Sequence, residues 1–310
     1  MADLSLFRCP SCQGSLTQTT EALVCASCKA VYPIRQDIPR FVSAEHYVQS
    51  FGFEWRYFNV RREAEDDAIF RVKTGWTPDM LKGKKVLDAG CGSGRYSAVA
   101  AQWGADVTSV DLSLAVEKAK DIAGSLGATI AQADLMTLPF APETFDFAFS
   151  IGVMHHTTKT EDAFKSVAKL VKPGGRMAVW LYRKVTLPQR TLNSFIRSIT
   201  TRLPNPLLLR LCYVPAFLAG IPGLNKVLGR MVNLGCTHPE WTMRLCDAFD
   251  WYSPKYQHLH TEGELKTWFE ESGFTDIRLL PPQNTDPFYL WVYRNDLIIG
   301  SGVNAEARKK

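Results

Sequence analysis

A glycine-rich loop between an apolar strand and a helix most constrains what this chain can fold into. The stretch VLDAGCGSG at residues 86–94 places an acidic residue at the end of the strand and three glycines before the helix. Glycines let the backbone approach a ligand closely, and the N-terminus of the helix supplies free amides and positive potential. The sequence therefore predicts a binding site for a polar ligand at this loop.

Strands and helices alternate around the loop. Strands are expected at residues 84–90, 105–111, 128–134, 144–150 and 175–183, and helices at 93–104, 113–127 and 160–171. After a break, the pattern resumes with a helix at 261–273 and strands at 274–281 and 287–294. We expect the tail from Ser301 to be frayed. The alternation predicts an α/β fold, a Rossmann-like sheet of seven strands covered by helices.

Changes in composition along the chain predict four segments. These are a small N-terminal unit at 1–45, a helical connecting segment at 46–83, a Rossmann-like core at 84–183 and 261–296, and a helical insertion at 184–260. Seven prolines divide the insertion into apolar helical pieces. In the connecting segment, six of the twelve residues from Tyr47 to Phe58 are aromatic.

The overall composition is that of a folded protein. Hydrophobic residues make up 46% of the 310 residues and charged residues 22%, which does not indicate disorder. A net charge of +5 is too modest to indicate nucleic-acid binding by itself. No run of 18 apolar residues occurs, and the N-terminus has neither the basic nor the apolar region of a secretory signal. A cytoplasmic location is therefore expected.

Acidic residues end three successive strands and suggest what the loop binds. The run is G-x-G-x-G rather than the G-x-G-x-x-G of dinucleotide-binding folds, which suits a ligand without a pyrophosphate, such as a zwitterionic amino acid. Asp111 lies 23 residues after Asp88, where a carboxylate can accept both hydroxyls of a ribose. Asp134 ends the next strand and is followed by Leu135, placing an acceptor and an apolar contact near a purine edge. A nucleoside that carries an amino acid fits this pattern.

With these motifs, residues 84–182 resemble the class I S-adenosylmethionine-dependent methyltransferases, especially small-molecule and tRNA methyltransferases with D-x-G-C-G-x-G. The stretches at 138–156 and 170–180 add to the resemblance. It implies S-adenosylmethionine as cofactor, held by Asp88, Gly90, Cys91, Gly92, Gly94, Asp111, Leu112, Asp134, Leu135, Ser150 and Ile151. The alternatives are a nicotinamide or flavin enzyme, and a cofactor-binding scaffold without catalysis.

Two C-x-x-C pairs predict a metal site near the N-terminus. Cys9 and Cys12 are followed after twelve residues by Cys25 and Cys28, an arrangement suited to tetrahedral zinc held by four thiolates. A segment of about 45 residues has too little core to fold alone, so the metal would supply stability. A redox C-x-x-C would need a thioredoxin-like context, which is absent.

With the following YPIRQDIPRFV, this segment resembles the small zinc-ribbon protein that activates several tRNA, ribosomal RNA and translation-factor methyltransferases, here fused in cis. The resemblance implies that the ribbon stabilises its partner, so we assign its cysteines no catalytic role. The other four cysteines are scattered, which favours a reducing compartment over a disulfide framework.

Histidines are the candidates for a general base, if the acceptor must lose a proton. His155 and His156 follow the strand that ends at Ser150, near the expected pocket edge. His258 and His260 precede the resumed helix, where the chain can cross the pocket mouth. Each of the four could instead cap a helix or satisfy backbone groups. The aromatic residues at 47–58 could cover the cationic sulfonium or simply pack on the sheet.

The expected acceptor is a small molecule held under the insertion, amphiphilic or lipid-like in character. The rival is a wobble-uridine type of tRNA methyltransferase, suggested by the ribbon and by the SIGVMHH stretch. From Lys184 to Gly235 there are seven basic residues and no acidic one, interleaved with apolar pieces. Such a surface can lie on an anionic membrane, enclose an amphiphile, contact RNA, or pack on the core with its basic side solvated. The sequence does not indicate an oligomeric state.

Overall fold

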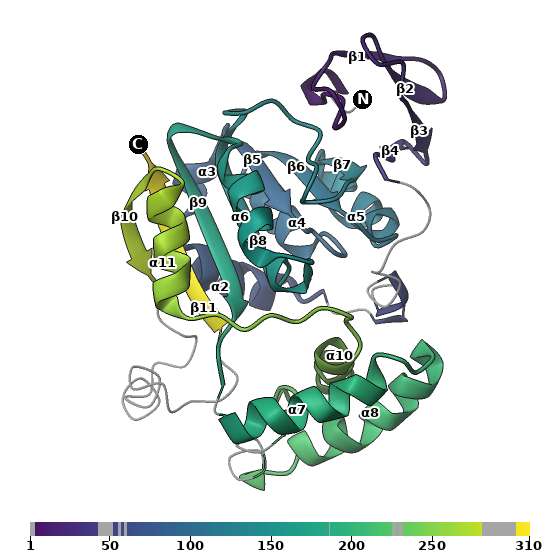
Figure 1. Ribbon diagram of the computed structural model, residues 1–310, viewed down its shortest axis with the longest axis vertical. Coiled ribbons are helices and arrows are strands. Elements are labelled where there is room, and N and C mark those ends of the chain that lie inside the picture. Colours follow the sequence, from purple (N-terminus) through teal and green to yellow (C-terminus); the bar gives the residue numbers. More distant parts are fainter. Residues whose placement is uncertain are drawn as a thin grey trace.

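The computed structural model describes residues 4–42, 52–54, 57–58, 61–185, 187–224, 228, 232–280 and 302–310. A seven-stranded sheet lies at its centre, with a small four-stranded sheet near one edge and a group of helices beyond one end of the strands (Figure 1). None of the described helices is long and apolar enough to cross a membrane.

The central sheet has the strand order β10-β11-β9-β8-β5-β6-β7. Its parallel strands are β5 (Lys85–Ala89), β6 (Asp106–Asp111), β7 (Thr129–Gln132), β8 (Phe145–Ile151) and β9 (Val171–Tyr182). The expectation of a seven-stranded Rossmann-like sheet is confirmed. Strand order reverses between β5 and β8, and in open parallel sheets ligands bind at such a switch point, outside the carboxyl ends of the strands.

Helices cover both faces of the sheet (Figure 1). On one face, α6 (Thr160–Ala168) lies against β9, and α11 (Glu262–Glu271) lies against β10 and β11, with Phe164 and Phe269 buried in the core between helices and sheet. On the other face, α2 (Glu63–Thr74), α3 (Pro78–Leu81), α4 (Arg95–Gln102) and α5 (Val116–Ile122) form a second core around Phe70 and Phe149. Thr261 and Glu264 form a capping box that begins α11.

The seventh strand is not the expected one. It is β11 (Gly302–Lys309), which pairs antiparallel with β9 and with β10 (Phe274–Leu279). The prediction of a frayed tail is wrong, and the sheet extends past residue 296, where the core was expected to end. The expected strand at 287–294 lies outside the described residues. Polar side chains made the tail look solvated, but Glu306 is fully buried and paired with Arg176 and Arg278.

Between β9 and α11 the chain forms helices α7 (Leu187–Thr200), α8 (Asn205–Ala219) and α10 (Trp241–Tyr252). They share a core of their own, in which Leu208, Cys212 and Ala216 of α8 pack against Leu245 and Phe249 of α10. Figure 1 shows this group beyond the carboxyl ends of β5, β8 and β9. The division of the chain with a helical insertion at 184–260 stays a prediction.

The aromatic residues before α2 pack on this insertion rather than on the sheet. Phe53 lies 5.6 Å from Phe249 between ring centroids, and Phe58 is buried in the same core. Tyr47, Phe51 and Trp55 lie outside the described residues. Phe53 and Phe58 therefore neither cover the expected sulfonium position nor pack on the sheet, which were the two expectations for this cluster. The sequence could not show that a helix almost 200 residues away would cover them.

The N-terminal unit is a four-stranded antiparallel sheet of β1 (Leu16–Gln18), β2 (Ala22–Cys25), β3 (Val31–Arg35) and β4 (Ile38–Pro39). It docks beside β7, the edge strand of the central sheet. There the backbone amide of Phe41 donates to the carbonyl of Gln132 at 2.8 Å, and the amide of Arg8 donates to that of Pro139 at 2.8 Å. The ring of Phe7 stacks on Phe140.

Candidate active site

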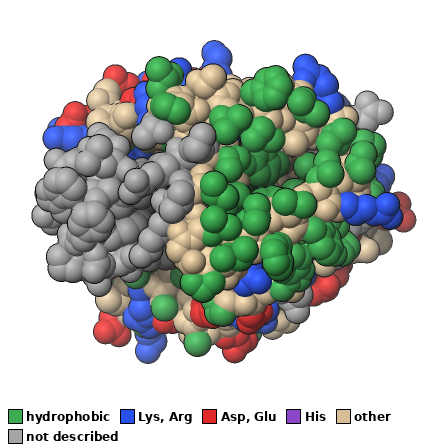
Figure 2. Space-filling model, turned by 90° about the horizontal axis from the view of Figure 1, so that it is seen from below, with side chains coloured by type: hydrophobic (Ala, Val, Ile, Leu, Met, Phe, Trp, Pro, Cys, Tyr) green, Lys and Arg blue, Asp and Glu red, His purple; other side chains and the backbone are tan. Residues whose placement is uncertain are grey.

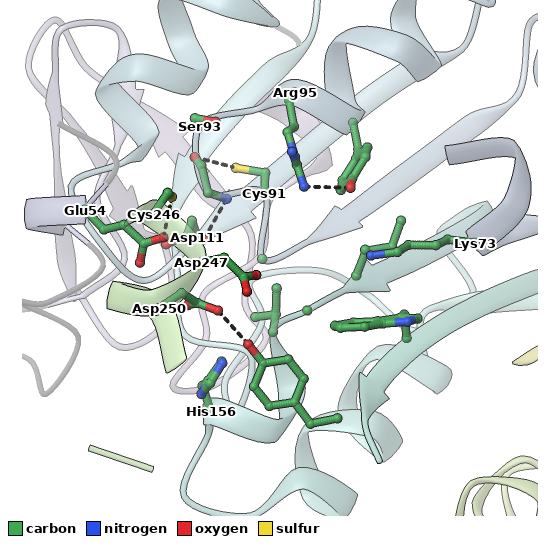
Figure 3. A pocket seen from close by; sticks show the side chains of 18 of the residues that line it. Glu54, Lys73, Cys91, Ser93, Arg95, Asp111, His156, Cys246, Asp247 and Asp250 are labelled. Carbon is green, nitrogen blue, oxygen red and sulfur yellow. Dashed lines mark hydrogen bonds between the residues drawn. The ribbon is translucent and has the colours of Figure 1, made fainter. Parts of the chain in front are cut away.

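A cavity of about 510 Å³ lies at the carboxyl ends of β5, β6, β8 and β9, under α10. Its volume falls in the range of pockets that bind small molecules. Figure 3 shows Cys91 and Ser93 of the glycine loop beside Glu54, Cys246, Asp247 and Asp250. Lys73 lies across the cavity from this acidic group. The switch point of the sheet and the insertion therefore build one pocket together.

The glycine loop needs glycine at two positions for different reasons. Gly90 has a φ of +93°, and a Cβ there would lie 2.3 Å from Cγ1 of Val153, so the loop passes the end of β8 too closely for any side chain. Gly94 has a φ of +81°, and its Cβ would lie 2.9 Å from Cα of Ala119 on α5. Glycine at position 90 lets the loop lie against Val153, and glycine at position 94 lets α4 and α5 pack closely.

Asp111 at the end of β6 lines the pocket and holds the loop. Its Oδ2 accepts a hydrogen bond from the amide of Gly92 at 2.9 Å, and its Oδ1 accepts from the amide and hydroxyl of Ser113 at 2.8 and 2.7 Å. Burial raises the pKa of Asp111, and these hydrogen bonds counteract part of the rise. A carboxylate offers about four lone-pair positions, so Asp111 keeps acceptor capacity for a ligand.

Asp88 does not line the pocket. It is buried below the loop, where its Oδ2 accepts a 2.6 Å hydrogen bond from the hydroxyl of Ser97, which in turn accepts from Ser109. Burial raises its pKa to about 7, with a further rise from the charge of Asp111. Its position is that of a residue that anchors α4 beneath the loop.

Most of the residues predicted to hold a cofactor meet in the pocket wall. Those that line it are Gly90, Cys91, Gly92, Asp111, Leu112, Asp134, Leu135 and Ile151. Asp88, Gly94 and Ser150 do not line it. The hydroxyl of Ser150 instead donates to the carbonyl of Ala89 at 2.7 Å and ties β8 to the end of β5. No part of the structure tests which residues contact a ligand, so these roles stay predictions.

Of the four candidate histidines, His156 alone lines the pocket. Its Nδ1 lies 2.9 Å from the carbonyl oxygen of Tyr256, which can only accept, so Nδ1 carries the proton of the neutral ring. Burial lowers its pKa to about 3. His156 is therefore neutral at physiological pH and a weak base, not the base of near-neutral pKa that the sequence suggested.

The other three histidines support the pocket from outside. His155 is fully buried and stacks on Tyr182 with 3.9 Å between ring centroids. Nε2 of His258 lies 3.1 Å from the carbonyl of Thr157, and Nε2 of His260 lies 3.0 Å from the hydroxyl of Thr160. The last two contacts join the 253–260 segment to Thr157 and to the first residue of α6. Such structural roles are the alternative that the sequence left open for the histidines.

One face of α10 lines the pocket and was not predicted from the sequence. Met243, Cys246, Asp247 and Asp250 all line the cavity. Their spacing of i, i+3, i+4 and i+7 puts them on one side of a helix, and this spacing is the signal that could have indicated a shared face. The sequence alone could not show that this face, rather than the opposite one, would turn toward the glycine loop.

Three carboxyl groups reach the cavity from the insertion side. Glu54 is almost fully buried, and its Oε1 accepts from Sγ of Cys246 at 3.3 Å, while Oε2 has no partner among the described residues. Asp250 accepts a 2.6 Å hydrogen bond from Tyr182. Asp247 faces the cavity, and burial together with the charge of Asp250 raises its pKa to about 6. Burial also raises the pKa values of Glu54 and Asp250.

Two basic side chains complete the wall. Nζ of Lys73 lies 3.9 Å from the ring centroid of Trp180, and burial lowers its pKa to about 7. Arg95, at the start of α4, donates to the hydroxyl of Tyr96 at 2.7 Å and pairs with the buried Asp66. The balance of charge in the pocket is nonetheless acidic.

Residues 87–179 match the methyltransferase domain family. The chain carries a methyltransferase domain. The matched residues include Gly90, Gly92, Asp111 and Asp134, which line the pocket, and most of the strands β5 to β9.

Relatives of the methyltransferase domain match over this part of the chain. The domain is 36% identical over 118 residues to sterol methyltransferase-like 2 of Botryococcus braunii, covering 36% of this chain and 30% of that protein. It is 36% identical over 126 residues to the ubiquinone biosynthesis O-methyltransferase of Stutzerimonas stutzeri, covering 37% and 54%. The matches thus span about a third to a half of these relatives.

A solved structure shares the fold of the methyltransferase domain. The putative sarcosine dimethylglycine methyltransferase of Galdieria sulphuraria superposes with a TM-score of 0.51 at 13% identity, covering 84% of this chain and 98% of that one. At this level of identity the similarity concerns the fold only.

The four N-terminal cysteines form a second candidate site, away from the methyltransferase pocket. Residues 4–37 match the Trm112p-like protein family. The Sγ atoms of Cys9, Cys12, Cys25 and Cys28 all lie within 4.8 Å of one another. Four thiolates around a tetrahedral zinc ion at about 2.3 Å would stand about 3.8 Å apart, so this donor set fits zinc.

Proposed function

We propose that the chain transfers a methyl group from S-adenosylmethionine to a small-molecule acceptor bound between the glycine loop and α10. The observation that carries this proposal is the convergence of the loop, Asp111 and Asp134 on the same cavity as the carboxyl groups of α10. When bound, S-adenosylmethionine supplies an electrophilic methyl group on a cationic sulfur.

The charges of the pocket support a cationic ligand. Glu54, Asp247 and Asp250 crowd the insertion side. Burial raises the pKa values of all three, and the charge of Asp250 raises those of Glu54 and Asp247 further. A positive charge placed among them would relieve this repulsion and favour their ionised forms. The amides at the start of α4 suit a carboxylate, and Asp111 suits a ribose, so a zwitterionic nucleoside with a sulfonium fits the donor set.

The wall opposite the loop supports an acceptor with an apolar body. Trp180 and Tyr182 end β9 inside the pocket, and Met243 faces them from α10. The chain would position such an acceptor, and exclude water, by packing these side chains around it. His156 offers a hydrogen-bond acceptor to the bound molecule. The acidic insertion side disfavours an anionic group close to α10, so we place any such group toward Lys73.

The N-terminal unit offers few basic residues that could contact tRNA, the rival acceptor. An RNA enzyme should carry a basic surface onto this unit. Of its basic residues, Arg40 is buried against the methyltransferase domain, where it donates to Gln132 and pairs with Glu117. Arg8, Lys29 and Arg35 remain, which is a small positive patch.

We also propose that residues 1–45 form a structural zinc unit. Cys9, Cys12, Cys25 and Cys28 would hold the ion, and its binding free energy would stabilise a sheet of only four short strands. Because this sheet covers the edge strand β7, we infer that it stabilises the methyltransferase domain and takes no part in methyl transfer.

The test of methyl transfer uses two matched glycine variants. Gly90 and Gly127 both have a φ of +93°, but a Cβ at Gly127 meets nothing within 4 Å. Gly90→Ala should therefore weaken S-adenosylmethionine binding at least tenfold in calorimetry, whereas Gly127→Ala should change it less than threefold. Thermal unfolding of both variants controls for backbone strain, which they share.

The acceptor class is tested by incubating the purified protein with methyl-labelled S-adenosylmethionine and fractionated cell extract. Label in a small-molecule fraction, lost with Gly90→Ala, supports the proposal. Label in tRNA alone would replace the acceptor by the rival. Absence of S-adenosylmethionine binding to a zinc-loaded, folded protein would overturn the assignment as a methyltransferase and favour a scaffold.

A further inference from the structure

The outer surface of α7 and α8 is apolar to an unusual extent. Among the described residues, sixteen large hydrophobic side chains are exposed, and ten of them lie between Leu187 and Ile221. The most exposed are Leu187 at 68%, Phe195 at 65%, and Val214 and Phe217 at 63% each. Scattered exposed hydrophobic residues are normal in soluble proteins, but their concentration on one pair of helices marks an interaction surface.

Figure 2 looks onto this end of the molecule and shows hydrophobic side chains gathered over a broad area, with Lys and Arg side chains among and beside them. On α7, Leu192, Phe195 and Ile199 follow one another at spacings of three and four. On α8, Leu211 and Val214 continue the same pattern. Each stripe therefore occupies one face of its helix.

Helix α8 is apolar on both sides. Its inner face, with Leu208, Cys212 and Ala216, already packs on α10. Its outer face, with Val214 and Phe217, is not needed for that core. A helix that is hydrophobic all round is normally surrounded by apolar material, and none of the described residues covers the outer face of α8 in this way.

The charged residues of α7, α8 and the turn between them are all basic, and the Asp and Glu side chains in Figure 2 lie at the margin of the apolar area. Arg190, Arg202 and Arg210 are exposed, and no acidic residue occurs from Lys184 to Gly235. Arg210 lies within the apolar stripe of α8, where its long aliphatic stem can pack while the guanidinium reaches a polar headgroup. Arg197 was expected to belong to this surface, but it turns inward and donates to the carbonyls of Trp251 and Pro254.

We propose that the outer face of α7 and α8 docks on the surface of an anionic lipid bilayer. Apolar side chains with arginines among them and no acidic groups are the features of helices that lie in the headgroup region. Apolar contacts could bind a protein partner equally well. A protein partner would not explain, however, why no acidic residue occurs from Lys184 to Gly235.

Docking would couple the membrane to the pocket through one helix. The inner face of α10 supplies Met243 and Asp247 to the cavity, and its other face carries Leu245 and Phe249 against α7 and α8. The docked surface thus lies one helix layer from the acceptor site. The inference goes beyond methyl transfer, and it does not depend on which acceptor is methylated.

The test is flotation of the purified full-length protein with large unilamellar vesicles, without methyl donor or acceptor. Vesicles of phosphatidylcholine alone are compared with vesicles that contain phosphatidylglycerol as well. Partition onto the anionic vesicles should fall at least tenfold in the triple variant Phe195→Ser, Val214→Ser, Phe217→Ser. The control triple variant Val31→Ser, Leu126→Ser, Leu279→Ser removes exposed apolar side chains elsewhere and should bind like the wild type within about twofold.

A charge variant separates the electrostatic attraction to anionic lipid from the contribution of the apolar side chains. Arg190→Glu, Arg202→Glu, Arg210→Glu should abolish the preference for anionic over neutral vesicles, and added salt should weaken the wild type in the same direction. S-adenosylmethionine binding by each variant reports whether the rest of the fold is intact, so a failure of docking is distinguishable from a failure of the proposed methyl transfer.

Three outcomes would overturn the proposal. The wild type does not float with either kind of vesicle, or the apolar and control variants float equally. The third is a wild-type dimer in sedimentation experiments that the apolar variant converts to monomer, with no vesicle binding, because a second copy of the chain would then cover this face.

Discussion

The phenolic oxygen of Tyr182 donates a 2.6 Å hydrogen bond to Oδ2 of Asp250, and this bond joins the end of β9 to α10 across the pocket. The ring of Tyr182 is stacked between His155 and Trp251, with centroid distances of 3.9 and 4.9 Å. The methyltransferase sheet and the insertion are therefore held together at the site where we place the acceptor.

Tyr182→Phe should lower the free energy of unfolding by about 1–2 kcal/mol, because it keeps the ring packing and leaves the buried Asp250 without its donor. Denaturant unfolding at pH 8 measures this change. Tyr213→Phe, at an exposed tyrosine of α8, should have no effect beyond error. If both variants unfold like the wild type, the hydrogen bond does not stabilise the insertion.

Asp111→Asn should weaken S-adenosylmethionine binding at least tenfold, or about 1.4 kcal/mol, since it removes charge-assisted acceptance by the carboxylate. Asp106 begins the same strand at its exposed end, so Asp106→Asn is a matched control and should bind normally. Calorimetry on the two variants makes the comparison. Equal affinities would remove Asp111 from the ligand site.

Binding of a cationic ligand should weaken as the pH falls below about 6. The pKa of Asp247 is raised to about 6 by burial and by Asp250. A bound cation favours the carboxylate, so binding at lower pH must release a proton, at a cost of up to about tenfold in Kd per pH unit. The affinity should therefore decline from pH 6 to pH 5, and the charge that Lys73 gains near its pKa of about 7 should weaken the binding of a cation in the same direction.

Asp247→Asn should remove much of this pH dependence, whereas the exposed Asp121→Asn should leave it unchanged. The Kd of S-adenosylmethionine measured between pH 5 and pH 8 gives both slopes. An unchanged slope in Asp247→Asn would show that another group controls the titration.

Arg40→Ala should lower the thermal midpoint of the whole protein. Arg40 is buried between the N-terminal unit and the methyltransferase domain, where its guanidinium reaches Oε1 of Gln132 at 3.2 Å and Oε1 of Glu117 at 3.4 Å. Its loss leaves buried polar groups and a gap, at about 1–3 kcal/mol. Arg35→Ala, at an exposed residue of β3, is the control. Equal midpoints would mean that this docking contact does not stabilise the fold.

Purified wild-type protein should contain one zinc ion per chain by metal analysis. Cys12→Ser and Cys28→Ser should each reduce this content strongly, because four thiolates are needed to close a tetrahedral site. Cys236→Ser, at a cysteine outside the cluster, should leave it unchanged. A wild type that is free of metal and still unfolds cooperatively would exclude a structural zinc.

Part of the site could be read from the sequence because its signals are local. The run VLDAGCGSG combines a strand, glycines and a helix start within nine residues, and successive parallel strands bring their carboxyl ends to one edge of a sheet. Asp111, Asp134 and Gly90 all line the pocket, and their contacts with a ligand stay predictions. The cysteine pairs are local for the same reason, since each pair forms one turn.

Other parts depended on contacts between distant segments. Asp88 has the same strand-end position as Asp111, yet Ser97 takes its carboxylate beneath the loop. The polar tail became β11 because Arg176 and Arg278 neutralise Glu306 inside the sheet. No local pattern predicts these pairings. Ser97 follows Asp88 by only nine residues, but the two side chains meet because α4 packs on β5, whereas Glu306 lies 28 and 130 residues from its two arginines.

The sequence by itself determined the type of fold, the glycine loop with its acidic strand ends, and the cysteine cluster, because short-range spacing and periodicity encode these features. Only the tertiary structure decided that Glu54, Asp247 and Asp250 complete the pocket, and that Phe195 and Phe217 remain outside it. Which face of an apolar helix turns inward is set by how the insertion packs on the sheet. That packing is a property of the whole chain, and no single stretch of residues carries it.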